Sequence, residues 1–236
     1  MQAYVYEKPR TLDEAEFADY LDPGTTAVIS IDMHRGHLDE SPDCPCPAPR
    51  ARDLVAPLDA FHDQVRAAGV RLVHVRATVR PNGEDDLNGI PAAWRRTFPL
   101  HVGPIPNSDG HAIEGSKWTE WCTRVEPTDM RVDTKRRLSA FYPSDLDFLL
   151  RNQRIETVVL DGGFTDCCVL NTAFDANNHN YRVIVLRDLV RGTDPHLEGA
   201  ALSMVSLHLG LVMDSAELLR VWAERKPARA PTESRR

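Results

Sequence analysis

Short runs of apolar residues alternate along this chain with longer segments in which apolar residues recur at helical spacing, and this alternation constrains the fold most. The run Thr26–Ile31 predicts a buried strand, and residues 54–68 predict a helix that ends at Gly69. Further strands are predicted at 71–75, 130–133, 157–160, 182–186 and 211–213, with helices beginning near 145, 168, 196 and 215. Strands that are apolar throughout must be covered on both faces. We therefore predict a doubly wound, mostly parallel sheet with helices on both faces, a three-layer α/β/α fold.

Segments of different character divide the 236 residues. Residues 1–24 are polar and acidic with scattered aromatic side chains, and we expect an arm that packs either on its own domain or on a partner subunit. Residues 25–222 predict one α/β domain, and the basic, proline-containing residues 223–236 predict a disordered tail. Residues 76–129 show little periodicity, and a loop this long is usually functional. We expect it to wall a pocket.

Composition excludes several classes of partner. The formal net charge is −7 without a basic stripe, which argues against nucleic acid. The N-terminus has no signal-peptide pattern, and no window approaches the roughly 18 apolar residues that span a bilayer. We therefore expect a cytoplasmic protein with no membrane partner. Five cysteines are few and odd in number, which argues against a disulfide framework, and Cys44 and Cys46 lack a second pair at zinc spacing.

Three reactive side chains directly follow predicted strands. Asp32 follows the first strand, Lys135 follows the strand at 130–133, and Cys168 follows a glycine-containing turn after the strand at 157–160. Because ligands bind at the carboxyl ends of strands in such sheets, we expect the three to converge in one pocket. A cysteine at a helix N-terminus favours the thiolate, a carboxylate can accept its proton, and an ammonium stabilises both anions. The residues alone leave open the ordinary alternatives of a turn-forming Asp, a solvated Lys and a buried, inert Cys.

Three motifs resemble those of the isochorismatase-like hydrolase superfamily. TAVISIDMHRGHL resembles its opening strand and aspartate, KRRLSAFYPSDLDFLL its lysine motif, and VVLDGGFTDCCVLNTAFDANNHNYRVIVLRD its cysteine motif. The motifs occur in the family's order over roughly residues 25–215. The Thr-Asp-x-Cys-Val register selects Cys168 and leaves Cys167 at the variable position. Residues 25–222 are thus identified as an isochorismatase-like domain, closest in layout to N-carbamoylsarcosine amidohydrolase and biuret hydrolase.

The resemblance implies a cysteine amidohydrolase that cleaves a small amide or ureide through a thioester and releases ammonia. It assigns Asp32 as general base, Lys135 as the family's lysine and Cys168 as nucleophile. It also implies a cis peptide between Gly163 and Phe164, with the backbone N–H groups of Phe164 and Cys168 binding the oxyanion. The alternatives are a vinyl-ether hydrolase of the isochorismatase type and a catalytically silent binding or scaffold protein. These hydrolases are often homo-oligomers, so a dimer or tetramer is expected.

The resemblance implies less about the substrate. No histidine follows in LDESPDCPCPAPR after His34 and His37, so the nicotinamidase metal pattern is incomplete and we predict neither a metal nor another cofactor. His37 stands where the family often has an aromatic residue, and we expect it to contact the substrate, as we do Trp94 in the long loop. The carboxylate-binding arginine of N-carbamoylsarcosine amidohydrolase aligns with Thr193. Candidates to replace it are Arg191 and the pair of arginines at 95–96.

Overall fold

The computed structural model describes residues 1–85, 90 and 92–225, and the predicted tail lies mostly outside these residues. The strands are β1 (Gln2–Val5), β2 (Lys8–Thr11), β3 (Thr26–Ile31), β4 (Arg71–Ala77), β5 (Met130–Lys135), β6 (Thr157–Gly163), β7 (Arg182–Arg191) and β8 (Gly210–Met213). The α-helices are α1 (Arg35–Leu38), α2 (Val55–Ala67), α3 (Trp94–Val102), α4 (Leu146–Asn152), α5 (Leu170–Asn178), α6 (Pro195–Met204) and α7 (Ser215–Glu224). Two π-helical turns, η7 (Thr165–Val169) and η8 (Val205–Leu209), precede α5 and follow α6.

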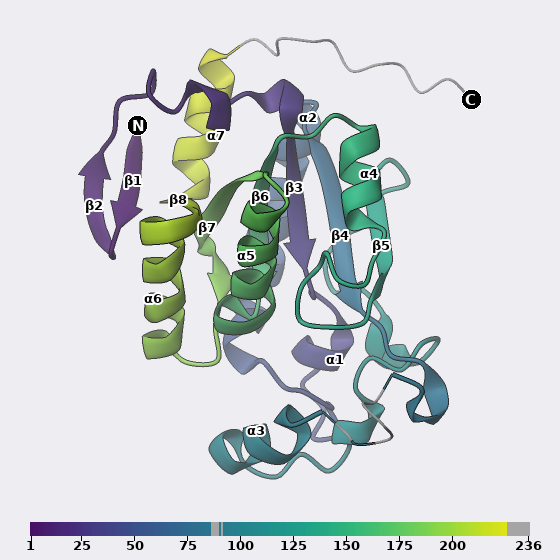
Figure 1. The fold of residues 1–236 in the computed structure, drawn as a ribbon. Coiled ribbons are helices and arrows are strands. Elements are labelled where there is room, and N and C mark those ends of the chain that lie inside the picture. Colours follow the sequence, from purple (N-terminus) through teal and green to yellow (C-terminus); the bar gives the residue numbers. More distant parts are fainter. Residues whose placement is uncertain (86–89, 91, 226–236) are drawn as a thin grey trace.

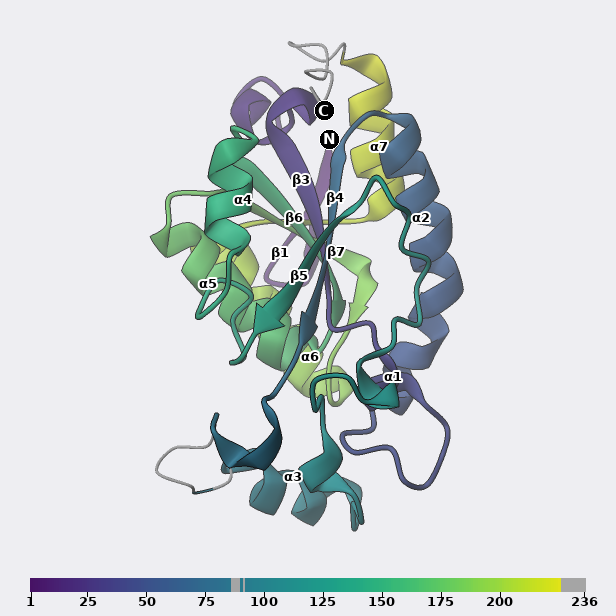
Figure 2. The same ribbon diagram turned by 90° about the vertical axis from the view of Figure 1, so that its right-hand side faces the viewer.

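The strands form one sheet in the order β2-β1-β8-β7-β6-β3-β4-β5. All pairs from β8 to β5 are parallel, whereas β1 pairs antiparallel with both β2 and β8. Helices α2 and α7 cover one face of the sheet, and α4, α5 and α6 cover the other (Figures 1 and 2). The predicted doubly wound fold is confirmed.

The chain reverses its direction of winding between β3 and β6, which lie side by side at the centre of the sheet. It runs outward from β3 to β4 and β5, returns to β6, and then runs the other way to β7 and β8. The crevice at the carboxyl ends of such central strands is the usual ligand site of a doubly wound sheet. The fold therefore brings the ends of β3 and β6 to the expected position of a site.

Two segments without a strong periodic signal contain regular structure. Residues 2–11 form a hairpin that extends the sheet. This part of the N-terminal arm therefore packs on its own domain, which is one of the two placements expected from the sequence. The Tyr4 hydroxyl donates to Asp214, 2.8 Å away, and Ala3 is buried.

The long segment 76–129 contains α3, and it lies at the end of the sheet where β3 ends (Figure 1). Pro99 lies inside α3 and interrupts the pattern by which a helix is predicted.

Candidate active site

Asp32 directly follows β3, which ends at Ile31. It is 2% exposed and adopts a left-handed backbone conformation with φ 55°. Its Oδ1 accepts a hydrogen bond from the Ala77 amide, 2.6 Å away, at the end of the neighbouring strand β4. Its Oδ2 lies 2.6 Å from the Nζ atom of Lys135. The carboxylate is thus held on both oxygens, and its orientation is determined by two strands.

Lys135 is the last residue of β5 and is 1% exposed. Its Nζ atom donates to Asp32 Oδ2 at 2.6 Å and to Cys168 Sγ at 3.4 Å. The ammonium therefore bridges the carboxylate and the sulfur. The prediction that the three side chains converge in one pocket is confirmed. Their catalytic roles remain proposals.

The turn that carries Cys168 depends on Gly162. This glycine has φ 98°, and a Cβ atom placed on it would lie 2.3 Å from the carbonyl oxygen of Ile31 in β3. Only glycine therefore allows β6 to approach β3 this closely. The Gly163–Phe164 peptide is cis, as predicted. Cys168 is the fourth residue of the π-helical turn η7, one turn before α5, instead of the first residue of an α-helix.

Burial and charge oppose each other at the ion pair. Burial acts to raise the pKa of Asp32, but the Lys135 ammonium and the nearby imidazoles outweigh it and hold that pKa below its ordinary value. Burial likewise acts to lower the pKa of Lys135, and the attraction of Asp32 and Cys168 raises it instead. Both groups are therefore charged at neutral pH. Each depends on the other for this state, because neither reaches solvent.

The resting state of Cys168 differs from the sequence expectation. A hydrogen bond with Cys167 raises the pKa of the Cys168 thiol, and burial raises it further, whereas Lys135 acts to lower it. The same hydrogen bond lowers the pKa of Cys167. The sequence predicted a lowered pKa for Cys168, because only the helix N-terminus and the lysine could be taken into account. Cys168 is only 6% exposed, and because its pKa is raised we expect a thiol and not a thiolate in the resting site.

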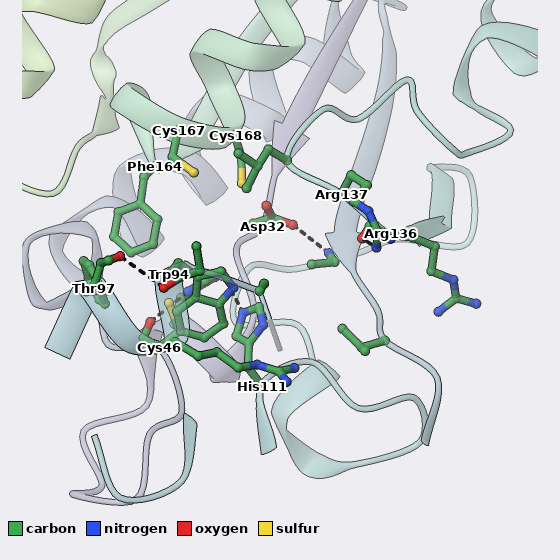
Figure 3. Close-up of a pocket in the computed structure, with 18 of the residues that line it drawn as sticks. Asp32, Cys46, Trp94, Thr97, His111, Arg136, Arg137, Phe164, Cys167 and Cys168 are labelled. Atoms are coloured by element: carbon green, nitrogen blue, oxygen red, sulfur yellow. Dashed lines mark hydrogen bonds between the residues drawn. The ribbon is translucent and has the colours of Figure 1, made fainter. Parts of the chain in front are cut away.

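These side chains line a cavity of about 790 Å³. Of the predicted substrate-contacting residues, His37, Trp94 and Thr193 line it. Arg191 is not in the lining: its Nη1 atom donates to the carbonyl of Val190 at 2.6 Å and to that of Asp188 at 3.4 Å. Arginines that do line the cavity are Arg95, Arg96, Arg136 and Arg137. Figure 3 shows Arg136 and Arg137 at the side of the cavity away from Phe164.

Two site residues, His34 and His111, carry no sequence pattern that predicts a place in the site. His34, His37 and His111 each offer a ring nitrogen, and these atoms lie within 4.8 Å of one another, the one group among the described residues that meets the geometry of a metal site. His34 is the N-cap residue of α1 and His37 lies within that helix, but His111 lies in the long loop, where no local pattern relates it to them. Cys44 and Cys46 do not join this group. The Cys44 thiol contacts the carbonyl oxygen of Gly36 at 3.4 Å, and the Cys46 side chain is buried at the cavity.

Within the described residues, no helix is both long enough and apolar enough to cross a bilayer.

Comparison with known proteins identifies the family. Residues 26–217 match the isochorismatase domain model. Maleamate amidohydrolase from Pseudomonas putida is 31% identical over 173 residues, 72% of this chain and 75% of that protein. Ureidoacrylate amidohydrolase RutB from Caulobacter segnis is 26% identical over 223 residues, 88% of this chain and 90% of that protein.

A solved structure has the same fold. N-carbamoylsarcosine amidase from Thermoplasma acidophilum aligns with a TM-score of 0.61 and 26% sequence identity, covering 81% of this chain and 96% of that one. The matched range includes the Asp32–Lys135 ion pair and Cys168. The chain therefore belongs to the isochorismatase family and is an isochorismatase-like hydrolase.

Proposed function

We propose that this protein is a cysteine amidohydrolase that cleaves a small, anionic amide or ureide and releases ammonia. The observation that carries the proposal is the double contact of Lys135 Nζ, 2.6 Å from Asp32 Oδ2 and 3.4 Å from Cys168 Sγ, at the wall of the cavity. A nucleophile, a proton acceptor and a cation that stabilises both anions thus share one site.

The proposed reaction begins with transfer of the Cys168 thiol proton to Asp32 as a substrate binds. The sulfur then attacks the carbonyl carbon and forms an S–C bond, while the carbonyl π electrons move to oxygen. When the oxyanion collapses, the C–N bond breaks and Asp32 returns the proton to the leaving nitrogen, which departs as ammonia. Water, deprotonated by Asp32, attacks the thioester. The S–C bond breaks, Asp32 returns the proton to the sulfur, and the product leaves as a carboxylic acid from an amide or as a carbamic acid from a ureide.

Two backbone amides are the proposed oxyanion donors. Phe164 follows the cis peptide and lines the cavity, and Cys168 carries its own amide beside the sulfur. Donors fixed in the backbone need little reorganisation as charge develops on the substrate oxygen, and removal of one such donor costs about 10²–10³ in kcat in other hydrolases. Lys135 also lines the cavity, but its Nζ already donates to the Asp32 carboxylate and to the sulfur, so we assign the oxyanion to the backbone amides.

The lining favours a substrate with a carboxylate. Four arginines line the cavity, and the Arg95 and Arg136 side chains are only 11% and 12% exposed. Arg136 donates to Thr78 Oγ1 at 2.8 Å, which orients its guanidinium. Guanidinium groups bind carboxylates through paired hydrogen bonds. Maleamate and ureidoacrylate, the substrates in the names of the two relatives, both carry a carboxylate. We therefore place the substrate's carboxylate toward these arginines.

A screen of small acidic amides and ureides for ammonia release tests the proposal. Cys168→Ser is expected to abolish turnover and Cys167→Ser, the matched control, to retain most of it. Rapid quenching followed by mass spectrometry should detect an adduct on Cys168 whose mass is that of the substrate less ammonia. Hydrolysis of a vinyl ether by Cys168→Ser without ammonia release would favour the isochorismatase reaction instead. Substrate binding without turnover in the unmodified protein would favour a silent binding protein.

A further inference from the structure

Three histidine rings converge at one wall of the cavity. The ring centroid of His37 lies 4.6 Å from that of His34 and 5.0 Å from that of His111. The Nε2 atoms of His37 and His111 are 3.5 Å apart. His34 is the N-cap residue of α1, His37 lies within α1, and His111 comes from the long loop 76–129. In Figure 3, His111 lies across the cavity from Cys168, with Asp32 between them.

Backbone contacts determine which ring nitrogens face the cluster. Nδ1 of His37 lies 2.8 Å from the carbonyl oxygen of Cys46, and this contact requires a proton on Nδ1, so Nε2 carries the lone pair. Nδ1 of His34 lies 2.9 Å from the carbonyl oxygen of Trp118 and 3.1 Å from the Gly36 amide. The Nδ1 atom cannot both donate a proton to the Trp118 carbonyl oxygen and accept one from the Gly36 amide. We assign the proton to Nδ1, because the carbonyl contact is the shorter one and only an N–H can donate to a carbonyl; Nε2 then carries the lone pair.

The remaining nitrogen of His34 has no partner. Its Nε2 atom is buried without a hydrogen bond, and the residue is 0% exposed. A buried polar atom left unpaired typically costs about 1–3 kcal/mol, so such an atom in a native site calls for a ligand. Neutral imidazole is the form that binds metal ions.

The spacing of the nitrogens fits a tetrahedral ion after a small adjustment. Zn–N bonds of 2.0–2.1 Å require ligand nitrogens about 3.3 Å apart. The His37–His111 separation of 3.5 Å is already close to this value, and the farthest pair is no more than 4.8 Å apart. Carbonyl groups that hold the Nδ1 protons of His34 and His37 are the usual outer partners of metal-bound histidines. Rotation of the His111 ring on its loop can supply the remaining movement.

We propose that His34, His37 and His111 form a binding site for one divalent transition-metal ion of the zinc class. Three imidazole ligands select such ions over Mg²⁺ and Ca²⁺, which prefer oxygen. The fourth position faces the cavity that His37 and His111 line, where water or a lone-pair donor of a bound molecule completes the coordination. The ion joins the long loop to the end of β3, next to the candidate catalytic residues. The site does not depend on the proposed amidohydrolase reaction.

Metal binding to the full chain, purified without a histidine tag and stripped with a chelator, tests the proposal. We expect one Zn²⁺ per chain by elemental analysis after dialysis, and one equivalent of Co²⁺ to produce the intense visible d–d bands of a four- or five-coordinate site. His111→Gln is expected to weaken Zn²⁺ binding by more than about 100-fold, a larger effect than the 10–100-fold that loss of an outer partner causes. His101→Gln, which changes a 60% exposed histidine in the same loop, should bind normally.

Three results would overturn the proposal. One is a stripped protein that binds no Zn²⁺ or Co²⁺ at micromolar concentration while its circular dichroism is native. Another is unchanged affinity in a folded His111→Gln variant. The third is a Co²⁺ spectrum dominated by sulfur-to-metal charge transfer, which would assign the ion to cysteines. Because each readout is binding and not turnover, failure of the amidohydrolase proposal leaves this test valid.

Discussion

Replacement of Lys135 by methionine should reveal how strongly the buried ion pair depends on both partners. Methionine has nearly the length of lysine, so the substitution removes the charge with little change in packing. The Asp32 carboxylate, 2% exposed, would then lack the cation 2.6 Å from its Oδ2. Breaking a buried pair on one side typically costs about 3–5 kcal/mol.

The protonation of Asp32 provides a second route to this magnitude. Without Lys135, burial is the largest influence on Asp32 and raises its pKa, so the carboxyl remains protonated when the variant folds at pH 7. An aspartate has a pKa of about 3.9 in the unfolded chain, so protonating it costs about 1.4 kcal/mol for each pH unit above that value, or about 4 kcal/mol at pH 7. The folded variant carries one more proton, on Asp32, than its unfolded chain does at pH 7. Its loss in free energy of unfolding relative to the unmodified protein therefore becomes smaller as pH falls. We expect a deficit of about 1.5 kcal/mol at pH 5.

Urea denaturation followed by tryptophan fluorescence at pH 5 and pH 7 measures both values. Asp32→Asn combined with Lys135→Met removes both charges and should recover most of the lost stability. Lys8→Met is the matched control at an exposed lysine, with an expected change within about 0.5 kcal/mol. A deficit below about 1 kcal/mol at pH 7, or one equal at both pH values, would refute this account of the pair.

Four further predictions follow from individual contacts. Cys167→Ala should shift alkylation of Cys168 to lower pH, because alanine removes the hydrogen bond that raises the pKa of Cys168; an unchanged or higher pH midpoint by mass-resolved iodoacetamide labelling would contradict this. Burial lowers the pKa of His74 to about 4, so its contribution to stability is complete above about pH 6.5 and is lost as pH falls toward 4; denaturation of His74→Gln should show a shallower acid slope. Gly162→Ala should cost at least about 2 kcal/mol in thermal unfolding, since its Cβ would lie 2.3 Å from the Ile31 carbonyl oxygen, and a native melting temperature would disprove the clash. Light scattering should give a homo-oligomer, and we propose that α3, whose Leu100 is 86% exposed, contacts the neighbouring subunit; a monomeric mass at micromolar concentration would exclude this.

The amino-acid sequence was sufficient to predict the fold and the reactive set because both leave local signals. An apolar strand followed at once by a reactive side chain marks the carboxyl end of a parallel strand, and these ends meet at one edge of the sheet. Asp32, Lys135 and Cys168 could therefore be placed together although they are far apart along the chain. Motif register then distinguished Cys168 from Cys167, and the cis Gly163–Phe164 peptide followed from the same resemblance and is present.

The direction of the Cys168 pKa could not be predicted in this way. It depends on how deeply the sulfur is buried and on its hydrogen bond with the Cys167 thiol, both of which arise from packing. Arg191 likewise was a reasonable candidate by position, but the fold turns its guanidinium to backbone carbonyls, and other arginines line the cavity.

Sequence by itself thus determined where the strands of the parallel core and most of its helices lie along the chain, and which reactive residues follow the strands, since these properties depend on near neighbours in the chain. Only the tertiary structure decided that the N-terminal segment extends the sheet through β1, and that His111 lies 3.5 Å from His37. The long loop has no periodicity that relates His111 to α1. Its position is set by contacts between segments distant in sequence, and such contacts exist only after the chain has folded.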